Sequence, residues 1–547
     1  MEARGQSESV SPGVRKPAEV SSRLARLMKR RALRARDIQL YRFCDVLTEP
    51  LIYFMAVFGP WAFGTTQSWS IWVMNSAAYV LGLMLVGKLA IRWLKGYRPA
   101  RWGTNSLNSK VQSLESEGQM RVSAGNWLGF PTASRLTAVV AGLTIAILAY
   151  CFVSALNARA TAHKGELGFD YWNSFIPWLP HSLDSSRSWP VFWSYLGLAC
   201  AFWAVRDWLL GKSDDEERAE LRRTLPGERG LAYFLPARLR RLLWVLAVNG
   251  GLLGLEGIAQ RLEGSGRLLF LVKPRVNPDA VTQFGPYAYR ANASQYFNLL
   301  WPVCLGFWWT LSRSRGLRRK AYQLVLGCCI IMAACPMIST SRGGALVTAG
   351  IAVLAAFFLA AAHFLLAAHR QQDRQARSRT LMTLLVFFVG ALSLGLALGW
   401  KTLQPRMARI GEDYEYREDM YARAQPMAAD YPLFGTGPGT FEPVFQLYRK
   451  STDTYWPAQL HNDWLETRIT FGWLGSALIG VALVAVLLRS FTPGGIHGGR
   501  RFIILIWLAL GGCLVHARYD FPFQVYSILF LFLVLCAILL DLTRQPG

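Results

Sequence analysis

Long blocks of apolar residues recur along the whole of this 547-residue chain, in which 52% of residues are hydrophobic and 17% are charged. Each block is roughly 17–25 residues long, which matches the thickness of a bilayer's hydrocarbon core. An open sheet cannot satisfy its backbone in lipid, so the blocks indicate helices. We predict an all-α polytopic membrane protein with about twelve transmembrane helices at residues 46–66, 69–94, 136–156, 189–205, 242–259, 295–311, 321–338, 345–367, 381–400, 472–488, 502–517 and 524–541.

The net charge of +25 is explained by topology, not by nucleic-acid binding. Lys and Arg gather mainly in alternate segments between the predicted spans, beginning with the N-terminal one. This is the positive-inside pattern, which places both termini in the cytoplasm. The remaining basic excess would attract anionic membrane lipids. We expect no nucleic-acid partner.

The predicted organisation follows from these spans. Residues 1–45 are a basic cytoplasmic segment without the apolar core of a signal peptide, and 22–42 could lie on the inner leaflet as a helix or remain a solvated tail. Residues 46–400 hold helices 1–9, and 401–471 form a large periplasmic loop between helices 9 and 10. Helices 10–12 then occupy 472–541, before a cytoplasmic tail at 542–547.

The nine cysteines give no sign of a disulfide framework or a zinc site. All but Cys44 fall inside predicted spans, where a free thiol behaves as a small hydrophobic side chain. No pair has the spacing of metal ligands. We therefore expect neither disulfides nor a bound metal.

Two of the predicted outer segments are ambiguous. In the segment 157–188, two prolines and a Trp within 175–181 favour a rigid loop at the membrane interface, with a substrate-contacting edge as the alternative. The segment 260–294 has a positive excess that runs against the orientation rule. Arg290, near its end, could bind lipid phosphate or serve an anionic ligand.

A short polar stretch at 339–344 separates two predicted spans. An ionisable residue such as Arg342 at the membrane boundary is costly and is therefore a functional candidate. The N–H groups that open the following helix, together with the helix dipole, could bind an anion. The alternative is an ordinary helix cap beside an Arg that reaches the lipid headgroups.

The segment 401–471 has nearly balanced charge and many aromatics, which predict a folded cap. Residues 416–429 are expected to form a helix that ends at Asp430-Tyr431-Pro432. The glycine-rich turn at 435–439 is a weak candidate for a phosphate loop, because Pro438 removes an N–H. His461, before a predicted span, could act as an acid or base, or could be part of a helix cap.

These motifs resemble those of the O-antigen ligase family of bacterial envelope proteins. The resemblance covers roughly 260–520 and is carried by His461-Asn462, nine residues, Gly472, two residues, and Gly475-Ser476. Three further stretches are similar to family motifs: Arg417 with Asp430-Tyr431-Pro432-Leu433-Phe434-Gly435-Thr436-Gly437, Ser341-Arg342-Gly343-Gly344, and Arg290-Ala291-Asn292. The family's loop arginine is often followed by Leu four residues later. Here Arg417 precedes Tyr421 and Arg342 precedes Leu346, so either could fill that role.

The resemblance implies a membrane glycosyltransferase in the bacterial inner membrane with a periplasmic active site. It would move a glycan from undecaprenyl pyrophosphate to a hydroxyl of a glycan, lipid or protein acceptor, without nucleotide sugar, ATP or another cofactor. Arginines can bind the leaving pyrophosphate in a bidentate way, and a neutral imidazole can take the acceptor's proton. We expect His461 to be catalytic and no metal to take part. The expected donor-binding residues are Arg290, Arg342 and Arg417, and the expected supporting residues are Asn292, Asn462 and Asp463.

Other readings remain open at this stage. A ligase, a polymerase and a protein O-oligosaccharyltransferase would use the same donor and differ only in the acceptor. Twelve spans are also common among secondary transporters, although we find no repeat between halves and the polar clusters lie at the outer face. A non-catalytic envelope scaffold is the third possibility.

Overall fold

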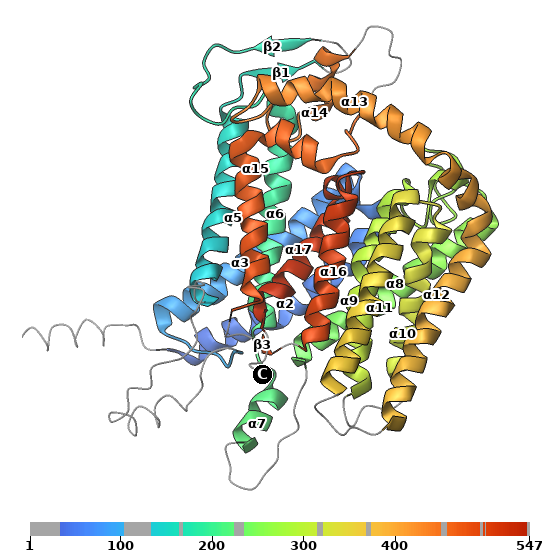
Figure 1. Ribbon diagram of the computed structural model, residues 1–547. Coiled ribbons are helices and arrows are strands. Elements are labelled where there is room, and N and C mark those ends of the chain that lie inside the picture. Colours follow the sequence, from blue (N-terminus) through green and yellow to red (C-terminus); the bar gives the residue numbers. More distant parts are fainter. Residues whose placement is uncertain are drawn as a thin grey trace, which may run out of the picture.

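The computed structural model consists mainly of long helices (Figure 1). It describes residues 33–102, 133–163, 168–223, 235–313, 321–367, 374–449, 457–492, 496–497 and 499–543. Most of the proposed inner-leaflet helix at 22–42 lies outside these ranges.

Every predicted span coincides with a helix. These helices are α2 (Ala35–Trp61), α3 (Ser68–Lys95), α5 (Ala133–Leu156), α6 (Ser185–Leu209), α8 (Ala237–Glu263), α9 (Arg290–Arg313), α10 (Ala321–Ile338), α11 (Arg342–Ala367), α12 (Arg374–Ala408), α15 (Asp463–Arg489), α16 (Arg500–His516) and α17 (Tyr526–Asp541). Within the described ranges, nine helices are long and apolar enough to cross a bilayer. The chain is therefore a multi-pass membrane protein. α9, α16 and α17 fall short in length or hydropathy, so the count of twelve stays a prediction.

Three helices extend furthest beyond the predicted boundaries. α2 begins at Ala35, inside the segment that we assigned to a cytoplasmic tail. α12 continues to Ala408, and α15 begins at Asp463 because Asn462 caps its first turn. The segment between these two membrane helices is therefore shorter than the predicted loop 401–471.

α9 lies at the centre of the helix bundle. It packs against α8, α10, α11, α16 and α17, and most of its side chains are buried. Its first turns nevertheless carry the buried polar residues Ser294, Gln295 and Asn298. The middle of this helix is apolar and includes Trp301, which is 1% exposed. The polar side chains of α9 are thus concentrated at the end that begins with Arg290.

A cap built from residues between α12 and α15 covers one end of the bundle. α13 (Ile410–Asp430) crosses from the end of α12 toward α15 (Figure 1) and confirms the expected helix at 416–429. α14 (Phe441–Phe445) and the short helix η3 (Gln446–Tyr448) pack beneath it. The apolar core of the cap includes Met420, Met427 and Phe441.

The remaining elements are short. Strands β1 (Ala160–Ala162) and β2 (Phe169–Tyr171) form an antiparallel pair, and β3 (Ile496–His497) pairs in parallel with β4 (Leu542–Thr543). Short 3₁₀ helices occur at η1 (Phe63–Thr65), η2 (Ala280–Thr282) and η4 (Pro522–Gln524). α7 (Asp214–Arg223) lies at the end of the bundle opposite the cap (Figure 1).

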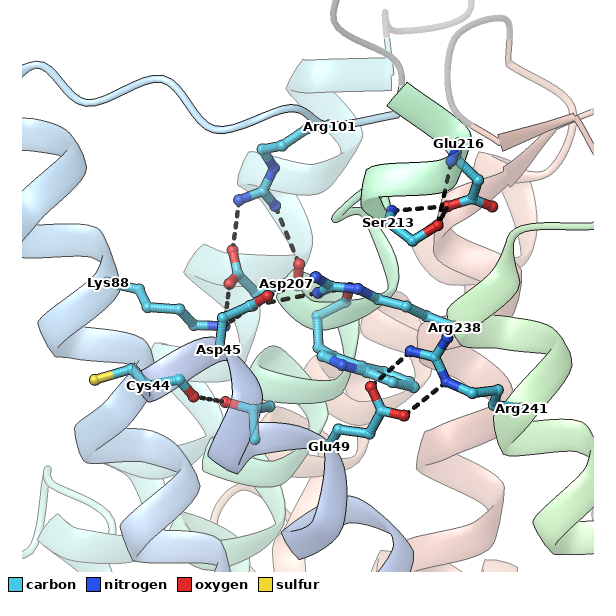
Figure 2. A network of polar contacts seen from close by, with 12 residues as sticks. Cys44, Asp45, Glu49, Lys88, Arg101, Asp207, Ser213, Glu216, Arg238 and Arg241 are labelled. Atoms are coloured by element: carbon cyan, nitrogen blue, oxygen red, sulfur yellow. Dashed lines mark hydrogen bonds and ion pairs between the residues drawn. The ribbon is translucent and has the colours of Figure 1, made fainter. Parts of the chain in front are cut away.

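Buried charges join the helices at the end opposite the cap. In the network of Figure 2, the Lys88 ammonium on α3 lies 3.1 Å from Asp45 of α2 and 2.9 Å from Asp207 of α6. Arg101 also binds Asp207, and Arg238 of α8 binds Asp45. The Lys88 side chain is fully buried, so losing one partner would leave a costly charge. The network therefore fixes how α2, α3, α6 and α8 meet.

Candidate active site

His461 lies directly before α15, at the end of the bundle that the cap covers. Its Nδ1 atom is 3.0 Å from Oδ1 of Asp520, in the turn between α16 and η4. Burial alone would raise the pKa of Asp520, but the hydrogen bond from His461, the nearby His516 side chain and the charge of Arg417 hold that pKa well below its usual range. An ionised carboxylate can only accept a hydrogen bond, so Nδ1 carries the proton. The opposite nitrogen, Nε2, is then the basic one.

Several groups fix the Asp520 carboxylate in place. The Tyr289 hydroxyl donates to Oδ2 over 3.2 Å, and the backbone N–H of Phe521 donates to Oδ1 over 3.1 Å. Nε2 of His516 lies 3.8 Å from Oδ2. The Asp520 residue is 5% exposed, so these contacts act in a region that excludes most water.

The backbone of His461 is held in an uncommon conformation. Its φ angle is +55°, in the left-handed region that non-glycine residues seldom adopt. The Tyr421 hydroxyl on α13 donates to the His461 carbonyl over 2.8 Å. The rings of Phe521 and Tyr289 meet the imidazole edge-on, with centroids 4.8 and 5.9 Å away. The His461 side chain is 23% exposed, and no hydrogen bond from the described residues occupies its Nε2.

Asn462 and Asp463 contribute to the position of α15, and their side-chain hydrogen bonds go to groups other than the imidazole. The Asn462 side chain accepts from the N–H of Leu465 over 3.2 Å. The N–H of Asp463 donates to the Ala517 carbonyl over 2.8 Å, and its carboxylate accepts from the N–H of Phe523 over 2.8 Å. The two residues therefore connect the start of α15 to the α16–η4 turn, which carries Asp520. Asn292 is buried in the first turn of α9, and its backbone N–H donates to the Tyr289 carbonyl over 3.1 Å.

The three arginines singled out from the sequence lie near one another and near this pair. Arg417 on α13 donates to the Tyr519 carbonyl, next to Asp520. Arg342, the first residue of α11, donates to the carbonyls of Arg406 and Arg409 over 3.1 and 3.4 Å. Arg290, the first residue of α9, donates to the Val281 carbonyl over 2.7 Å.

The three side chains lie close enough to Arg261 and Arg406, which the sequence analysis did not single out, for their positive charges to repel one another. The charge of Arg290 interacts with those of Arg406, Arg261 and Arg342. The charge of Arg342 interacts with those of Arg406 and Arg417. Arg261 donates to the carbonyls of Ala280, Gln283 and Ser339, which carry no full charge to compensate it. We call Arg261, Arg290, Arg342, Arg406 and Arg417 the arginine cluster.

The start of α11 is a capped helix end. The Ser341 hydroxyl accepts from the N–H of Gly344 over 3.2 Å, and the Ser341 carbonyl accepts from Ala345 over 2.8 Å. A Cβ on Gly344 would lie 1.8 Å from the Ser294 hydroxyl oxygen, so glycine lets α11 approach α9 closely. Ser341 therefore caps the helix, as one of the two interpretations of this stretch predicted. The Arg342 guanidinium lies in the arginine cluster.

The glycines of the His461 motif allow a break within α15. Gly472 has φ +61° and ψ −167°, which interrupts the helix. Backbone groups of the 432–437 loop fill the gap: the N–H of Thr436 donates to the Ile469 carbonyl over 2.9 Å, and that of Gly437 to Thr470 over 3.0 Å. These N–H groups are therefore already hydrogen-bonded within the protein. A phosphate loop would need them free to bind the phosphate, so the stretch is a structural turn. The break positions α15 against the cap.

One comparison with known proteins decides the family of this region. Residues 327–480 match the family model described as O-antigen ligase. This part of the chain is similar to the O-antigen ligase family. The match indicates a membrane glycosyltransferase of the ligase or polymerase type. No curated protein matches the chain.

The matched residues include His461, Arg342 and Arg417, but Arg290, Tyr289 and Asp520 lie outside them. Asp520 was missed in the sequence because it is 59 residues from His461 and comes from another pair of helices. Its one signal was an ionisable residue in the short segment between the last two predicted spans.

Proposed function

We propose that this chain transfers a glycan from a polyprenyl pyrophosphate carrier, of the undecaprenyl class, to an acceptor hydroxyl at the periplasmic face of the bacterial inner membrane. The observation that carries the proposal is the His461–Asp520 pair beside the arginine cluster. A base and a group of cations next to each other suit a reaction that removes a proton and releases an anion.

The base in this proposal is Nε2 of His461. Asp520 keeps the proton of the neutral ring on Nδ1, so the lone pair of Nε2 faces outward. As the acceptor oxygen bonds to the anomeric carbon, its proton passes to Nε2. The imidazolium that forms is stabilised by the Asp520 carboxylate, as in other base–carboxylate pairs.

The leaving group in this proposal is bound by the arginine cluster. The bond between the anomeric carbon and the phosphate oxygen breaks, and its electron pair goes to the lipid pyrophosphate. Fixed cations at the place where this negative charge develops lower the barrier without reorganisation. Arginine suits the task because its planar fork binds two phosphate oxygens at once. This chemistry requires no nucleotide sugar, ATP or metal ion.

Ligase and polymerase activity share this donor chemistry, so the acceptor distinguishes them. A lipid or protein acceptor gives a ligase or an oligosaccharyltransferase, and a growing glycan gives a polymerase. Deleting the gene in its host separates these cases. Accumulation of unligated polymer indicates a ligase, and accumulation of single repeat units indicates a polymerase.

The proposed transfer is tested with purified protein reconstituted in lipid vesicles and a polyprenyl pyrophosphate glycan as donor. Transfer of the labelled glycan to an added acceptor, without nucleotide or metal, supports the proposal. A protein that stays folded and transfers nothing from cognate donor to cognate acceptor would contradict it.

A further inference from the structure

His516 is a buried histidine that the transfer chemistry above does not use. It ends α16, and its side chain is 2% exposed. Its Nδ1 atom lies 2.7 Å from the side-chain oxygen of Gln295 on α9. Gly343 of α11 packs against the opposite nitrogen, since a Cβ there would lie 3.5 Å from Nε2. The ring is therefore enclosed by α9, α11 and its own helix.

The second nitrogen of this ring faces the carboxylate that holds the proposed base. Nε2 of His516 lies 3.8 Å from Oδ2 of Asp520, while Nδ1 of His461 lies 3.0 Å from Oδ1. The Asp520 carboxylate thus lies between two imidazoles. A separation of 3.8 Å is too long for a hydrogen bond, so the contact is electrostatic in this state. Catalytic contacts often tighten only when substrate binds.

The charge on Asp520 determines where His516 carries its proton. A bare lone pair on Nε2 would repel the ionised carboxylate, so an N–H faces Oδ2. Nδ1 then either donates to the Gln295 oxygen as part of an imidazolium, or accepts from the Gln295 amide after a flip. In both arrangements Gln295 and Asp520 hold the ring from opposite sides.

We propose that His516 is a positioning residue for glycan transfer. Its N–H attracts Oδ2 of Asp520, which keeps Oδ1 directed at His461 and the basic nitrogen directed at the acceptor. This proposal rests on the proposed function. Packing alone is a poor explanation for a histidine and a glutamine at 2% and 1% exposure, because apolar side chains avoid the cost of burying polar groups.

The test removes the polar pair without leaving either partner unsatisfied. In the double variant His516→Leu/Gln295→Leu both groups become apolar, which is often nearly neutral for stability. The purified variant is compared with wild type for thermal stability in detergent, and for kcat and KM of the donor. The expected result is near-normal stability, unchanged KM and a kcat lower by about 10–100-fold, the usual effect of losing a partner that orients a reactive histidine.

A stable double variant with wild-type kcat would overturn the proposal, because a structural role predicts that outcome. If the double variant does not fold, His516→Gln and His516→Met replace it. Both are of moderate size, but only Gln keeps an N–H donor, so Gln should retain more kcat than Met. Equal kcat values would also overturn the proposal. His497→Gln is the control, since His497 lies in β3 at the end of the bundle opposite the cap (Figure 1), and its variant should keep wild-type kcat.

Two further measurements separate this proposal from the proposed function. A folded wild type without transfer activity, or a fully active His461→Ala variant, would overturn the proposed function and this proposal with it. An active wild type and an inactive His461→Ala variant, together with His516 variants of full kcat, would overturn the role of His516 alone.

Discussion

As a base, the imidazole of His461 has to carry its proton on Nδ1 and be fixed in direction, and its neighbours favour both this tautomer and this direction. Asp520 binds Nδ1, while Tyr421 and the rings of Phe521 and Tyr289 restrain the residue from other sides. The sequence predicted a base at His461, but its partner could not be inferred from neighbouring residues. Asn462 and Asp463 follow it in the chain, yet they cap α15 and bind the next turn. Proximity in the sequence is a poor guide at a helix start, where adjacent side chains point apart.

Replacing Asp520 by Asn should reduce transfer by about 10²–10⁴-fold, because the amide can favour the wrong tautomer of His461 and cannot stabilise the imidazolium. Donor KM should change little. Steady-state kinetics of the purified variant in vesicles measures both values. A kcat within twofold of wild type would show that the carboxylate is dispensable.

The low pKa of Asp520 predicts which group sets the pH dependence. The pKa of Asp520 is lower in the folded protein than in the unfolded chain. The stability that this carboxylate contributes is therefore fully present above its unfolded-state pKa and is lost as the pH falls through its folded-state pKa. Asp520 therefore stays ionised from about pH 5 to 8. Imidazoles gain a proton in that range, so the transfer rate should fall as pH is lowered from about 8 to 5. A flat profile with intact protein would contradict a histidine base.

The arginines should differ from lysines at the same positions. Arg290→Ala, Arg342→Ala and Arg417→Ala should each lower the rate by about 10²–10³-fold, since each removes a charge-assisted bond to the developing anion. The Lys variants keep the charge but lose the fork, so they should be impaired too. The matched control is Arg275→Ala, an exposed arginine of the same segment 260–294 as Arg290, which should keep its activity. Full activity in all three stably inserted Ala variants would exclude the cluster as the donor site.

At the scale of elements, the glycines of the motif lie in α15, the same helix that His461 precedes. Gly472 interrupts α15, and the 432–437 loop bonds into the break. The end of α13 at Asp430 was predicted from Pro432, because a proline disfavours the helical conformation of the residue before it, although Pro426 is accommodated inside the same helix. The break in α15 could not be predicted from the sequence, because a single glycine in an apolar run is compatible with an unbroken membrane helix.

Gly472→Ala should destabilise the protein by more than about 2 kcal/mol, because alanine is strained at positive φ and the added Cβ would lie 2.3 Å from the Leu433 carbonyl oxygen. Thermal unfolding in detergent measures the loss. Gly480→Ala on the same helix is the control, because a Cβ there meets nothing within 4 Å. Equal melting temperatures for the two variants would contradict the role assigned to the break.

At the scale of the whole molecule, the sequence predicted the helical architecture well because membrane spans are set by length and hydropathy alone. It predicted the positions of α9, α16 and α17 as well, although they fall short of the criterion for a span. The sequence did not show that α9 is enclosed by other helices. Because it is enclosed, its polar residues Gln295 and Asn298 face protein and not lipid. The buried ion pairs around Lys88 could not be predicted from the sequence either, because they join helices that are far apart in the chain.

The predicted orientation can be tested by labelling single cysteines in intact cells with an impermeant reagent. Positions 110 and 222 should be protected and positions 275 and 455 should react, because basic segments remain in the cytoplasm. Arg222 lies in α7 and Arg275 before α9, whereas Lys110 and Tyr455 lie outside the described residues. Labelling at 110 or 222 would reverse the orientation and place the arginine cluster on the cytoplasmic side.

Glycan transfer by purified His461 variants tests most directly whether the His461–Asp520 pair is the catalytic centre. His163→Ala is the matched control, because His163 also pairs with an aspartate, Asp170, over 2.9 Å, but in the exposed β1–β2 hairpin. His461→Ala and His461→Gln should lose about 10²–10⁴-fold in rate while donor binding and expression stay near normal, and His163→Ala should match wild type. A His461→Gln variant as active as wild type would contradict the base role, because glutamine keeps a hydrogen bond but cannot take the proton.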